Sequence, residues 1–377
     1  MIYLDNSATT KVHPDVLEAM MPYLQEEYGN ASSKHYTLAE NSRNAIEDAR
    51  EHVAKLIGCK HDEVVFTSGS TESNNMILKG VMDYYQYRGK QLVVSKVEHS
   101  SILETAEYLK SKGNDVVFLD VDQYGRVKID DLEKLFTTDG NPLLVSIIWG
   151  NNETGSLNPI DSIATLCCKH NVFFHTDATQ VLGKYDVRNV ADGLGFLSCS
   201  AHKLHGPKGI GACIVKKDHQ GIKTRMTPLI HGGGQEFDYR SGTLSTHNIV
   251  GFGKAAEIAL HEINETRQIL EQLELQLRMR LNEYFSEILS FNSDDSNKIP
   301  GVINVRFKDV DNEFLVKELG DRVALSSGSA CSSTKPSHVL RGMGLNLEQI
   351  RSSIRISLSR FNTTEEINEF CRMLAGY

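Results

Sequence analysis

The chain lacks the features that mark several large classes of protein. It has 40 Lys and Arg against 49 Asp and Glu in 377 residues, so its formal net charge is −9. Proteins that bind nucleic acid through its phosphates usually present a basic face, and we therefore expect no direct nucleic-acid binding. The longest strongly apolar run, residues 143–149, is too short to span a bilayer, and we expect no membrane association.

Targeting and metal-binding signatures are missing as well. The first ten residues, MIYLDNSATT, contain no basic stretch followed by an apolar run, so we predict no secretory signal. The seven cysteines are scattered, without a CxxC pair or zinc-ligand spacing, and we predict no metal site. Reduced thiols in a cytoplasmic protein fit this cysteine usage best.

The chain does contain enough apolar sequence for a large core. Its hydrophobic fraction is 40%, and its length allows two or three domains. Helices are predicted at residues 14–24 and 39–57, the second ending at Gly58. Short runs rich in Val, Ile and Phe then alternate with helical stretches, which favours an α/β fold with a mostly parallel, fully covered sheet. These runs are residues 63–67, 91–95, 116–121, 143–149, 172–176, 196–200 and 210–215.

The pattern changes in the last third of the chain. Apolar side chains recur at helical spacing over residues 256–285, so we expect a long helix that joins the large domain to a smaller one. Residues 302–307 and 353–358 are interpreted as strands of that second domain. The last helix is expected to begin near Thr363, which can form a capping box with Glu366.

Polar segments directly follow five of the predicted strands. They are residues 67–72, His99, residues 151–153, residues 177–180 and residues 200–203. In open α/β sheets, ligands bind beyond the carboxyl ends of the strands. The five segments are therefore expected to face one crevice.

The first segment, TSGSTESNN at residues 67–75, leads from a strand into a helix start. Backbone N–H groups there, with the hydroxyls of Ser70 and Thr71, can bind a phosphate. Taken alone, an ordinary N-cap is the simpler interpretation. The segment is neither a Walker loop nor a GxGxxG fingerprint.

Two further segments place a carboxylate and an amine near the same edge. Asp177 ends the strand in HTDATQ, and its charge needs a partner: a protonated pyridine nitrogen, a helix N-terminus or a lysine. Lys203 follows beyond the next strand, in SCSAHKLHGPKG. A partly desolvated lysine has a lowered pKa and can form a Schiff base, although an exposed lysine in a glycine-rich turn is the plain alternative. Ser200 and His202 beside it could contact a phosphate.

The C-terminal part contributes a cysteine and an arginine. Cys331 lies among Gly and Ser in residues 326–341, a composition typical of an exposed loop, and we interpret it as a reactive thiol. The other six cysteines are interpreted as core or incidental. Arg355, in SIRISLSRF, can clamp a carboxylate through a bidentate pair, with solvent exposure or an internal salt bridge as alternatives.

In this order, the segments resemble those of the cysteine desulfurases of the NifS/IscS type, which belong to the class-V aminotransferases among the fold-type I pyridoxal-phosphate (PLP) enzymes. The resemblance runs nearly end to end, through YLDNSATT, TSGSTESNN, GNNETG, DATQ, SxHK, RSGT, SGSACSS and IRISLSR. It implies a large PLP-binding domain at residues 15–258 with a mostly parallel seven-stranded sheet. A smaller α+β domain would comprise residues 1–14 and 259–377, with the cysteine loop at about 326–337.

The resemblance also implies residue roles. Lys203 would hold PLP covalently, His99 would stack on its ring and assist proton transfer, and Cys331 would carry a persulfide. Asp177 would pair with the pyridinium nitrogen, Gln180 with the phenolic oxygen, and Asn152 would contact the same ring system. The phosphate contacts would be Ser70, Thr71, Ser200, His202 and, from the partner subunit of a homodimer, Thr243. The substrate contacts would be Arg355, Asn152 and Asn30.

The implied activity converts L-cysteine to L-alanine and delivers sulfur to an acceptor protein. Iron–sulfur cluster assembly, tRNA thiolation and DNA phosphorothioation all begin with such an enzyme. The chain departs from the family in one respect, because only four residues separate Cys331 from Pro336. This stretch is slightly longer in related SGSAC-type chains, and a shorter tether would restrict the movement of Cys331.

Three other interpretations remain at this level. Another fold-type I PLP enzyme, such as an aminotransferase or a selenocysteine lyase, would share Lys203 and Asp177 but would not need Cys331. A non-catalytic scaffold would keep the fold without the chemistry. An oxidoreductase that binds a nicotinamide cofactor would need a glycine fingerprint that the sequence lacks.

Overall fold

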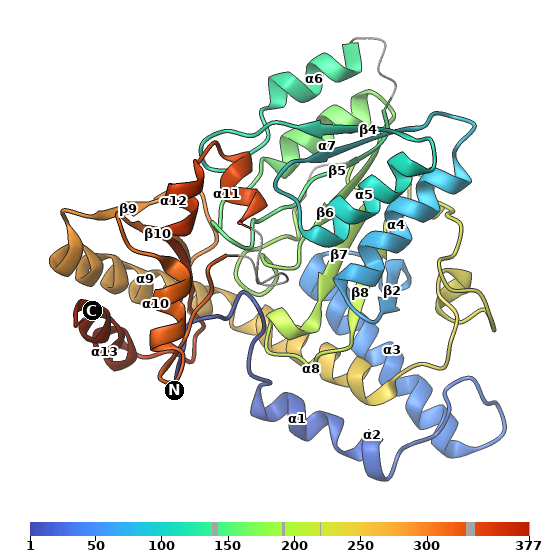
Figure 1. Ribbon diagram of the computed structural model, residues 1–377. Coiled ribbons are helices and arrows are strands. Elements are labelled where there is room, and N and C mark those ends of the chain that lie inside the picture. The colour runs from blue at the N-terminus through green and yellow to red at the C-terminus, as the bar shows by residue number, and fades with distance from the viewer. Residues whose placement is uncertain (138–141, 191–192, 219, 329–335, 377) are drawn as a thin grey trace.

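The computed structural model describes residues 1–137, 142–190, 193–218, 220–328 and 336–376. A large sheet lies at the centre of one half, with helices on both of its faces, and the C-terminal elements form a second body beside it (Figure 1). The predicted α/β class, with a smaller α+β part, is confirmed. In the described residues, no helix is long and apolar enough to cross a membrane.

The large sheet has seven strands in the order β2-β8-β7-β6-β5-β3-β4. Only β8 runs antiparallel to its neighbours, so the predicted mostly parallel sheet is confirmed. The strands are β2 (Val64–Thr67), β3 (Gln91–Ser95), β4 (Asp115–Leu119), β5 (Pro142–Ser146), β6 (Phe173–Asp177), β7 (Phe196–Ser200) and β8 (Gly211–Val215). All seven correspond to the runs predicted from the sequence.

Each face of this sheet is buried under its own helices. One face packs against α3 (Thr37–Ile57), α7 (Ile160–Lys169) and α8 (Thr246–His261), through side chains such as Phe174 and Ile214. The other face packs against α4 (Ser70–Tyr84) and α5 (Ser100–Ser111), through side chains such as Phe196 and Val215. Successive strand residues point to opposite faces, so burial on both sides requires the unbroken apolar runs seen in the sequence.

Helix ends follow local sequence signals. Gly58 ends α3 with φ 76°, a left-handed conformation that glycine adopts without a steric penalty. The single helix predicted at residues 14–24 is divided into α1 (Pro14–Met20) and α2 (Pro22–Gln25), because Pro22 has no N–H to continue the ladder. The single helix predicted over residues 256–285 is likewise wrong. It comprises the end of α8 and all of α9 (Ile263–Phe285), which meet at Glu262.

The C-terminal body has its own antiparallel sheet of three strands, in the order β12-β10-β9. Its strands are β9 (Leu289–Phe291), β10 (Val302–Phe307) and β12 (Ser353–Ser357). A separate apolar core joins this sheet to α9, α10 (Asn312–Leu319) and α13 (Thr364–Ala375). The capping box predicted for the last helix is present, because Thr363 and Glu366 bond reciprocally to backbone N–H groups.

Further short elements are α6 (Ile129–Thr137), β11 (Val323–Ala324), α11 (His338–Gly342) and α12 (Leu347–Arg351). The amino terminus lies with the C-terminal body, because β1 (Ile2–Tyr3) pairs in parallel with β11. Figure 1 shows both chain ends on this side of the molecule. The sequence did not predict β1, β9 or β11, since two or three residues are too few to show a period.

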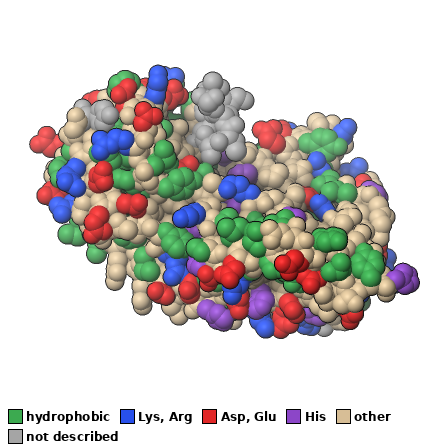
Figure 2. Space-filling view, turned by 90° about the horizontal axis from the view of Figure 1, so that it is seen from below, with side chains coloured by type: hydrophobic (Ala, Val, Ile, Leu, Met, Phe, Trp, Pro, Cys, Tyr) green, Lys and Arg blue, Asp and Glu red, His purple; other side chains and the backbone are tan. Residues whose placement is uncertain are grey.

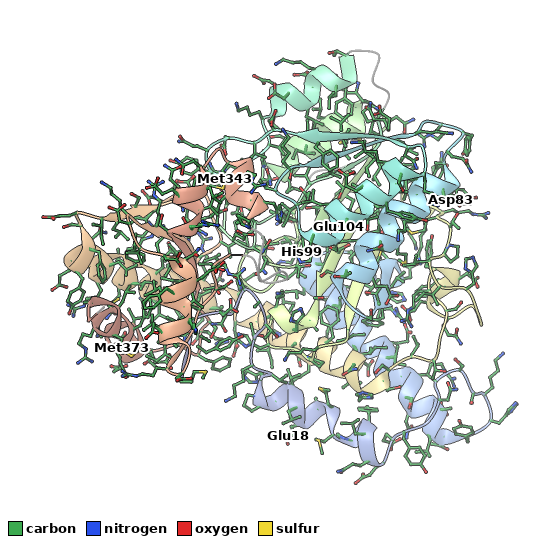
Figure 3. The ribbon with its side chains drawn as sticks, in the orientation of Figure 1. Glu18, Asp83, His99, Glu104, Met343 and Met373 are labelled. Atoms are coloured by element: carbon green, nitrogen blue, oxygen red, sulfur yellow. The ribbon has the colours of Figure 1, made fainter. Side chains whose placement is uncertain are left out.

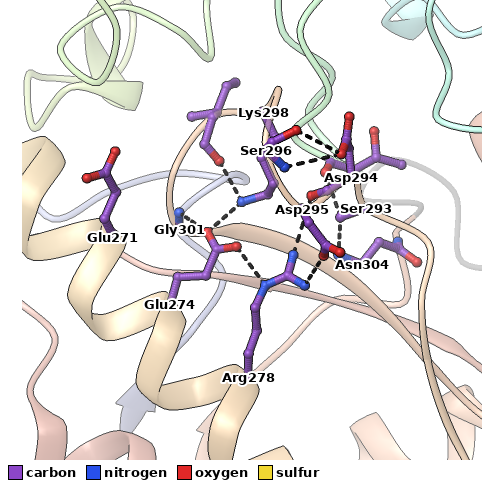
Figure 4. Close-up of polar contacts among 12 residues, drawn as sticks. Glu271, Glu274, Arg278, Ser293, Asp294, Asp295, Ser296, Lys298, Gly301 and Asn304 are labelled. Atoms are coloured by element: carbon purple, nitrogen blue, oxygen red, sulfur yellow. Dashed lines mark hydrogen bonds and ion pairs between the residues drawn. The ribbon is translucent and has the colours of Figure 1, made fainter.

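A buried network of charges fastens α9 to the segment that leads into β10 (Figure 4). Glu274 accepts hydrogen bonds from Lys298 Nζ at 2.5 Å, from the backbone N–H of Gly301 at 2.8 Å and from Arg278 Nε at 2.9 Å. Arg278 also pairs with Asp295 at 2.7 Å. Each polar atom of the Glu274 carboxylate is therefore satisfied, which a buried charge requires.

Figure 2 shows the molecule from below. Acidic and basic side chains are intermingled across this face, with apolar side chains between them. A mixed distribution of this kind gives this face no large patch of one sign.

Candidate active site

The carboxyl ends of five strands open into one cleft with about 1330 Å³ of empty space. The strands β2, β3, β5, β6 and β7 all point the same way, and each contributes lining residues from the loop that follows it. In Figure 3, His99 lies between the large sheet and the C-terminal elements. The predicted site residues that line the cleft are Ser70, Thr71, His99, Asn152, Asp177, Gln180, Ser200, His202, Lys203 and Arg355.

One end of the cleft is rich in hydrogen-bond donors. The helix α4 begins here at Ser70, whose backbone N–H donates to Ser200 Oγ at 2.8 Å. The two hydroxyl oxygens lie 3.3 Å apart. Burial, with the charges of Lys203 and Lys208, lowers the pKa of His202 to about 4, so its ring is neutral at pH 7. Free backbone N–H groups, hydroxyls and a helix N-terminus suit a phosphate group.

A carboxylate forms the floor of the cleft. Asp177 is the last residue of β6 and is buried, and its two oxygens accept from Asn74 Nδ2 at 2.8 Å and from the N–H of Thr179 at 3.0 Å. Nearby, Gln180 Oε1 is buried and has no hydrogen-bond partner among the described residues. Gln180 is held by its own amide, which donates to the carbonyl oxygen of Ser7 at 2.9 Å. An unpaired buried acceptor beside a buried carboxylate indicates a missing polar ligand.

Lys203 projects into the cleft from the short 3-10 turn η2 (Ala201–Lys203) that follows β7. Its Nζ donates to the carbonyl oxygens of Ser7 at 2.5 Å and Ala8 at 2.6 Å. Burial lowers the pKa of Lys203 to about 7, and the charges of Arg355 and Lys184 act in the same direction. A large fraction of this amine is therefore neutral, and nucleophilic, near pH 7.

His99 is fixed in orientation by the helix that it caps. Its Nδ1 accepts from the backbone N–H of Ser101 at 3.2 Å and lies 2.8 Å from the Ser101 hydroxyl. In the neutral ring, the proton is therefore on Nε2. Burial lowers the pKa of His99, with Asp177 opposing and Lys203 reinforcing the shift.

Arg355 approaches the cleft from β12 of the C-terminal body, with 1% of its surface exposed. Its Nη2 donates to Asp5 Oδ1 at 2.6 Å, and its Nη1 donates to the carbonyl oxygen of Asn152 at 3.1 Å. Within the part of the chain that the structure describes, its buried Nε has no hydrogen-bond partner. The internal salt bridge considered from the sequence is thus present, and the guanidinium still lines the cleft.

Two predicted site residues do not line the cleft in the described part of the chain, and a third lies outside that part. Asn30 is exposed, and its Oδ1 accepts from the N–H of Ser32 at 3.0 Å. Thr243 is exposed on this chain. Cys331 lies outside the described residues.

Sequence reasoning missed several groups that hold the site together. The carbonyls of Ser7 and Ala8 receive Lys203, and Asp5 receives Arg355, yet the segment YLDNSATT carried no role beyond the resemblance. Glu98 was also missed. It is 0% exposed beneath the cleft, and burial raises the pKa of its carboxyl to about 8. Glu98 Oε1 accepts from Ser95 Oγ at 2.5 Å and from the backbone N–H of Ile148 at 3.0 Å. Its burial could not be read from the sequence, because a glutamate in a polar segment is ordinarily exposed.

Comparisons with known proteins place this geometry in context. The family described as "Aminotransferase class-V" matches residues 2–370. A curated relative named "Cysteine desulfurase IscS", from Dictyoglomus turgidum, is 41% identical over 370 residues, covering 97% of this chain and 92% of the relative. A solved structure titled "NifS-like protein" is 36% identical with a TM-score of 0.90, over 100% of this chain and 98% of its own. A second, "SspA in complex with cysteine", is 35% identical with a TM-score of 0.82, over 96% and 100% of the two chains.

Proposed function

Because the chain belongs to the class-V aminotransferase family, and within it to the cysteine desulfurases of the NifS/IscS type, we propose that it releases sulfur from L-cysteine as a persulfide on Cys331. The enzyme is PLP-dependent, as members of this family are. The products are L-alanine and a sulfur atom for an acceptor. The observation that carries the proposal is the meeting of Lys203, Asp177 and Arg355 in one cleft.

The residues of the cleft fit PLP. Asp177 would receive the protonated pyridine nitrogen and the unpaired Gln180 Oε1 would bond to a polar ring substituent. Ser70, Thr71, Ser200 and His202 would hold the phosphate. When bound, PLP supplies an electron sink that stabilises negative charge at the Cα of an amino acid.

Side chains of the cleft would then transfer the protons and orient the substrate. Lys203, with its lowered pKa, would remove the Cα proton as a neutral amine and return it later. His99 presents an Nε2 proton whose direction is fixed by Ser101, so it would donate toward the cleft. Arg355, held by Asp5 and by the carbonyl oxygen of Asn152, would bind the substrate carboxylate, with Asn152 as a further contact. The resemblance also implies Asn30 as a lesser contact, although on this chain Asn30 is exposed and is not among the described residues that line the cleft.

Cys331 would take the sulfur. Its thiolate forms the S–S bond while the C–S bond of the substrate breaks, and the electron pair stays with the substrate carbon. Protonation of that carbon completes L-alanine. The persulfide would pass to a sulfur-acceptor protein of iron–sulfur cluster assembly, tRNA thiolation or DNA phosphorothioation, in the cytoplasm.

Two organisational features belong to the same proposal. Residues 15–258 would act as the PLP-binding domain, and residues 1–14 with 259–377 as the domain that carries the cysteine loop. The enzyme would act as a homodimer, with Thr243 of each subunit completing the phosphate site of the other. The exposure of Thr243 on the single chain supports this arrangement.

The test compares the wild type with Cys331→Ala. The visible spectrum is recorded for bound PLP, and alanine and sulfide release from L-cysteine are followed with a reductant present. We expect both proteins to be yellow and only the wild type to turn over. The matched control is Cys168→Ala, which removes an exposed thiol outside the cleft and should keep wild-type rates.

Full activity in Cys331→Ala would refute the persulfide mechanism and favour an aminotransferase. A colourless wild-type protein that does not bind added PLP would refute the PLP site itself and favour a non-catalytic scaffold.

A further inference from the structure

One buried carboxylate beside the cleft has no part in the steps above. Glu153 lies in the loop after β5, next to Asn152, and is 2% exposed. Its Oε2 accepts a hydrogen bond from Ser337 Oγ at 2.5 Å. Burial raises the pKa of Glu153 to about 7, while the bond from Ser337 and the charge of Arg355 oppose the shift. A buried acid of this kind is costly to keep unless its contacts have a purpose.

The same oxygen lies close to the chain at a second place. A Cβ added at Gly328 would lie 2.8 Å from Glu153 Oε2 and 3.9 Å from Ser337 Cβ. Gly328 also has φ +98°, a region that side chains rarely adopt. Gly328 and Ser337 flank residues 329–335 on either side. One carboxylate oxygen therefore accepts a hydrogen bond at one end of the segment that contains Cys331 and lies beside the backbone at the other end.

Both ends are also fastened to the cleft. On the amino side, Gly328 N–H donates to Ser326 Oγ at 3.1 Å, and the carbonyl oxygen of Ser326 accepts from the N–H of Arg355 at 2.7 Å. On the carboxyl side, His338 Nε2 lies 2.8 Å from the carbonyl oxygen of Glu98, next to His99.

The carboxyl side is held by packing as well. The side chains of Val339, Leu340 and Met343 form a small apolar core with Val97 and Ile350. This core joins α11 to the loop that presents His99. The end of the cysteine segment is therefore fixed to the large domain by apolar contact and by hydrogen bonds.

We propose that Glu153 is a positioning residue that clamps the two ends of the Cys331 segment to each other and to the loop that presents Asn152 to the cleft. The inference rests on the proposed function, since it concerns how Cys331 is presented to the substrate. The clamp is a contact between described residues: Gly328, Glu153 and Ser337. It acts on sulfur transfer and leaves PLP binding and cysteine binding to the rest of the site.

The test uses the PLP-loaded enzyme and three variants. Glu153→Ala removes the clamp, Gly328→Ala drives a Cβ against Glu153 Oε2, and Ser337→Ala removes the hydroxyl. Glu153→Gln is the conservative variant, because its amide oxygen can still accept from Ser337. Ser337 also caps α11 through the N–H of Leu340. Asn346→Ala therefore serves as a control, since it removes the cap of the neighbouring α12 without touching the clamp.

Two measurements distinguish an effect on the clamp from an effect on the cofactor site. The first is the single-turnover rate of persulfide formation, beside the PLP absorbance and the absorbance change on L-cysteine binding. The second needs no PLP: it is the alkylation rate of Cys331 by iodoacetamide, followed in the tryptic peptide 323–341, whose only cysteine is Cys331.

In Glu153→Ala and Gly328→Ala we expect persulfide formation to slow by roughly 10- to 100-fold, because small misplacement of a reacting group costs that much. Ser337→Ala should show a smaller loss in the same direction. The alkylation rate should change several-fold in all three, while cysteine binding stays within about twofold. Glu153→Gln and Asn346→Ala should stay near the wild type.

The proposal is overturned if Glu153→Ala and Ser337→Ala keep wild-type persulfide formation and alkylation, or if Asn346→Ala matches their loss. A loss of PLP from Glu153→Ala alone would also contradict it, because the role would then lie in the cofactor site. These results are distinct from failure of the proposed function, in which the wild type itself forms no persulfide.

Discussion

Lys203 shows how a single residue acquires reactivity from its surroundings. Its pKa is lowered to about 7 first by burial and then by the cations Arg355 and Lys184. The same buried position makes the charged lysine unfavourable for folding. Since the unfolded lysine holds its proton up to its ordinary pKa near 10.4, raising the pH from about 7 to that value favours the folded state. Reactivity at neutral pH is therefore linked to a loss of stability there.

This shift predicts how PLP reconstitutes the cofactor-free protein. The reaction needs the neutral amine of Lys203, so its rate should rise about tenfold per pH unit below pH 7 and level off above about pH 8. The rate is followed by the visible absorbance of the bound cofactor. Nα-acetyl-lysine provides the control, because the rate at which its ε-amine reacts with PLP should keep rising up to about pH 10. Any effect of the titration of PLP itself appears equally in both reactions. A protein rate that keeps rising alongside the control would contradict the lowered pKa of Lys203.

Among single residues, the sequence predicted those site residues that follow a strand of the large sheet. Lys203, Asp177 and His99 all lie at strand ends, where the parallel topology collects them in one cleft. It placed Glu153 and Asp5 only within the segments 151–153 and YLDNSATT, and it gave neither residue a partner or a role of its own. Glu153 meets Ser337 from 184 residues away and Asp5 meets Arg355 from 350 residues away, and no local pattern encodes such partners.

Among the elements, the strands of the large sheet were the most predictable. They are buried on both faces, which leaves continuous apolar runs in the sequence. Helix boundaries were harder. The break at Glu262 between α8 and α9 interrupts an apolar pattern that continues in both helices, and no proline or glycine marks it. The spacing of apolar residues shows which face of a helix is buried. It can continue unchanged where one helix ends and the next begins in a new direction.

The helix α9 offers a direct measure of a buried ion pair against an exposed one. Glu274 is buried with Lys298 and Arg278, whereas Glu271 on the same helix pairs with Arg267 in solvent. Glu274→Ala leaves Lys298 buried without its counter-charge and should lower the free energy of unfolding by about 3–5 kcal/mol. Glu271→Ala, the matched control, should cost about 0.5 kcal/mol or less. Chemical denaturation of both variants measures the two free energies of unfolding. Equal losses would show that the buried network of Figure 4 contributes no more than an exposed ion pair.

For the whole molecule, the decisive arrangement is the proposed homodimer. If Thr243 completes the site of the partner subunit, a Thr243→Asp subunit should damage the phosphate site of its partner and leave its own site intact, because a carboxylate repels phosphate. A Lys203→Ala subunit has a dead site of its own but an intact Thr243. Each homodimer alone should be almost inactive.

Mixing the two variants and allowing the subunits to exchange should restore activity to about one quarter of the wild type, since half of random dimers are hybrids with one complete site. Steady-state sulfide release measures the recovery. A mixture no more active than its components would show that Thr243 serves its own subunit or none. Size-exclusion chromatography of each variant verifies that dimers are present in every sample.

The pairing of β1 with β11 joins Ile2 to Val323, and Asp5 reaches Arg355 further on. At roughly 5–20 residues per second, a ribosome needs on the order of 15–70 s to extend the chain between these partners. Throughout that interval the amino-terminal segment cannot make its final contacts. The same segment contains Ser7 and Ala8, whose carbonyl oxygens accept hydrogen bonds from Lys203. A nascent chain that ends before β11 already contains Lys203, Asp177 and His99, yet it lacks both the strand that pairs with β1 and the Arg355 that receives Asp5. The catalytic cleft is therefore among the last parts of this protein to form during synthesis.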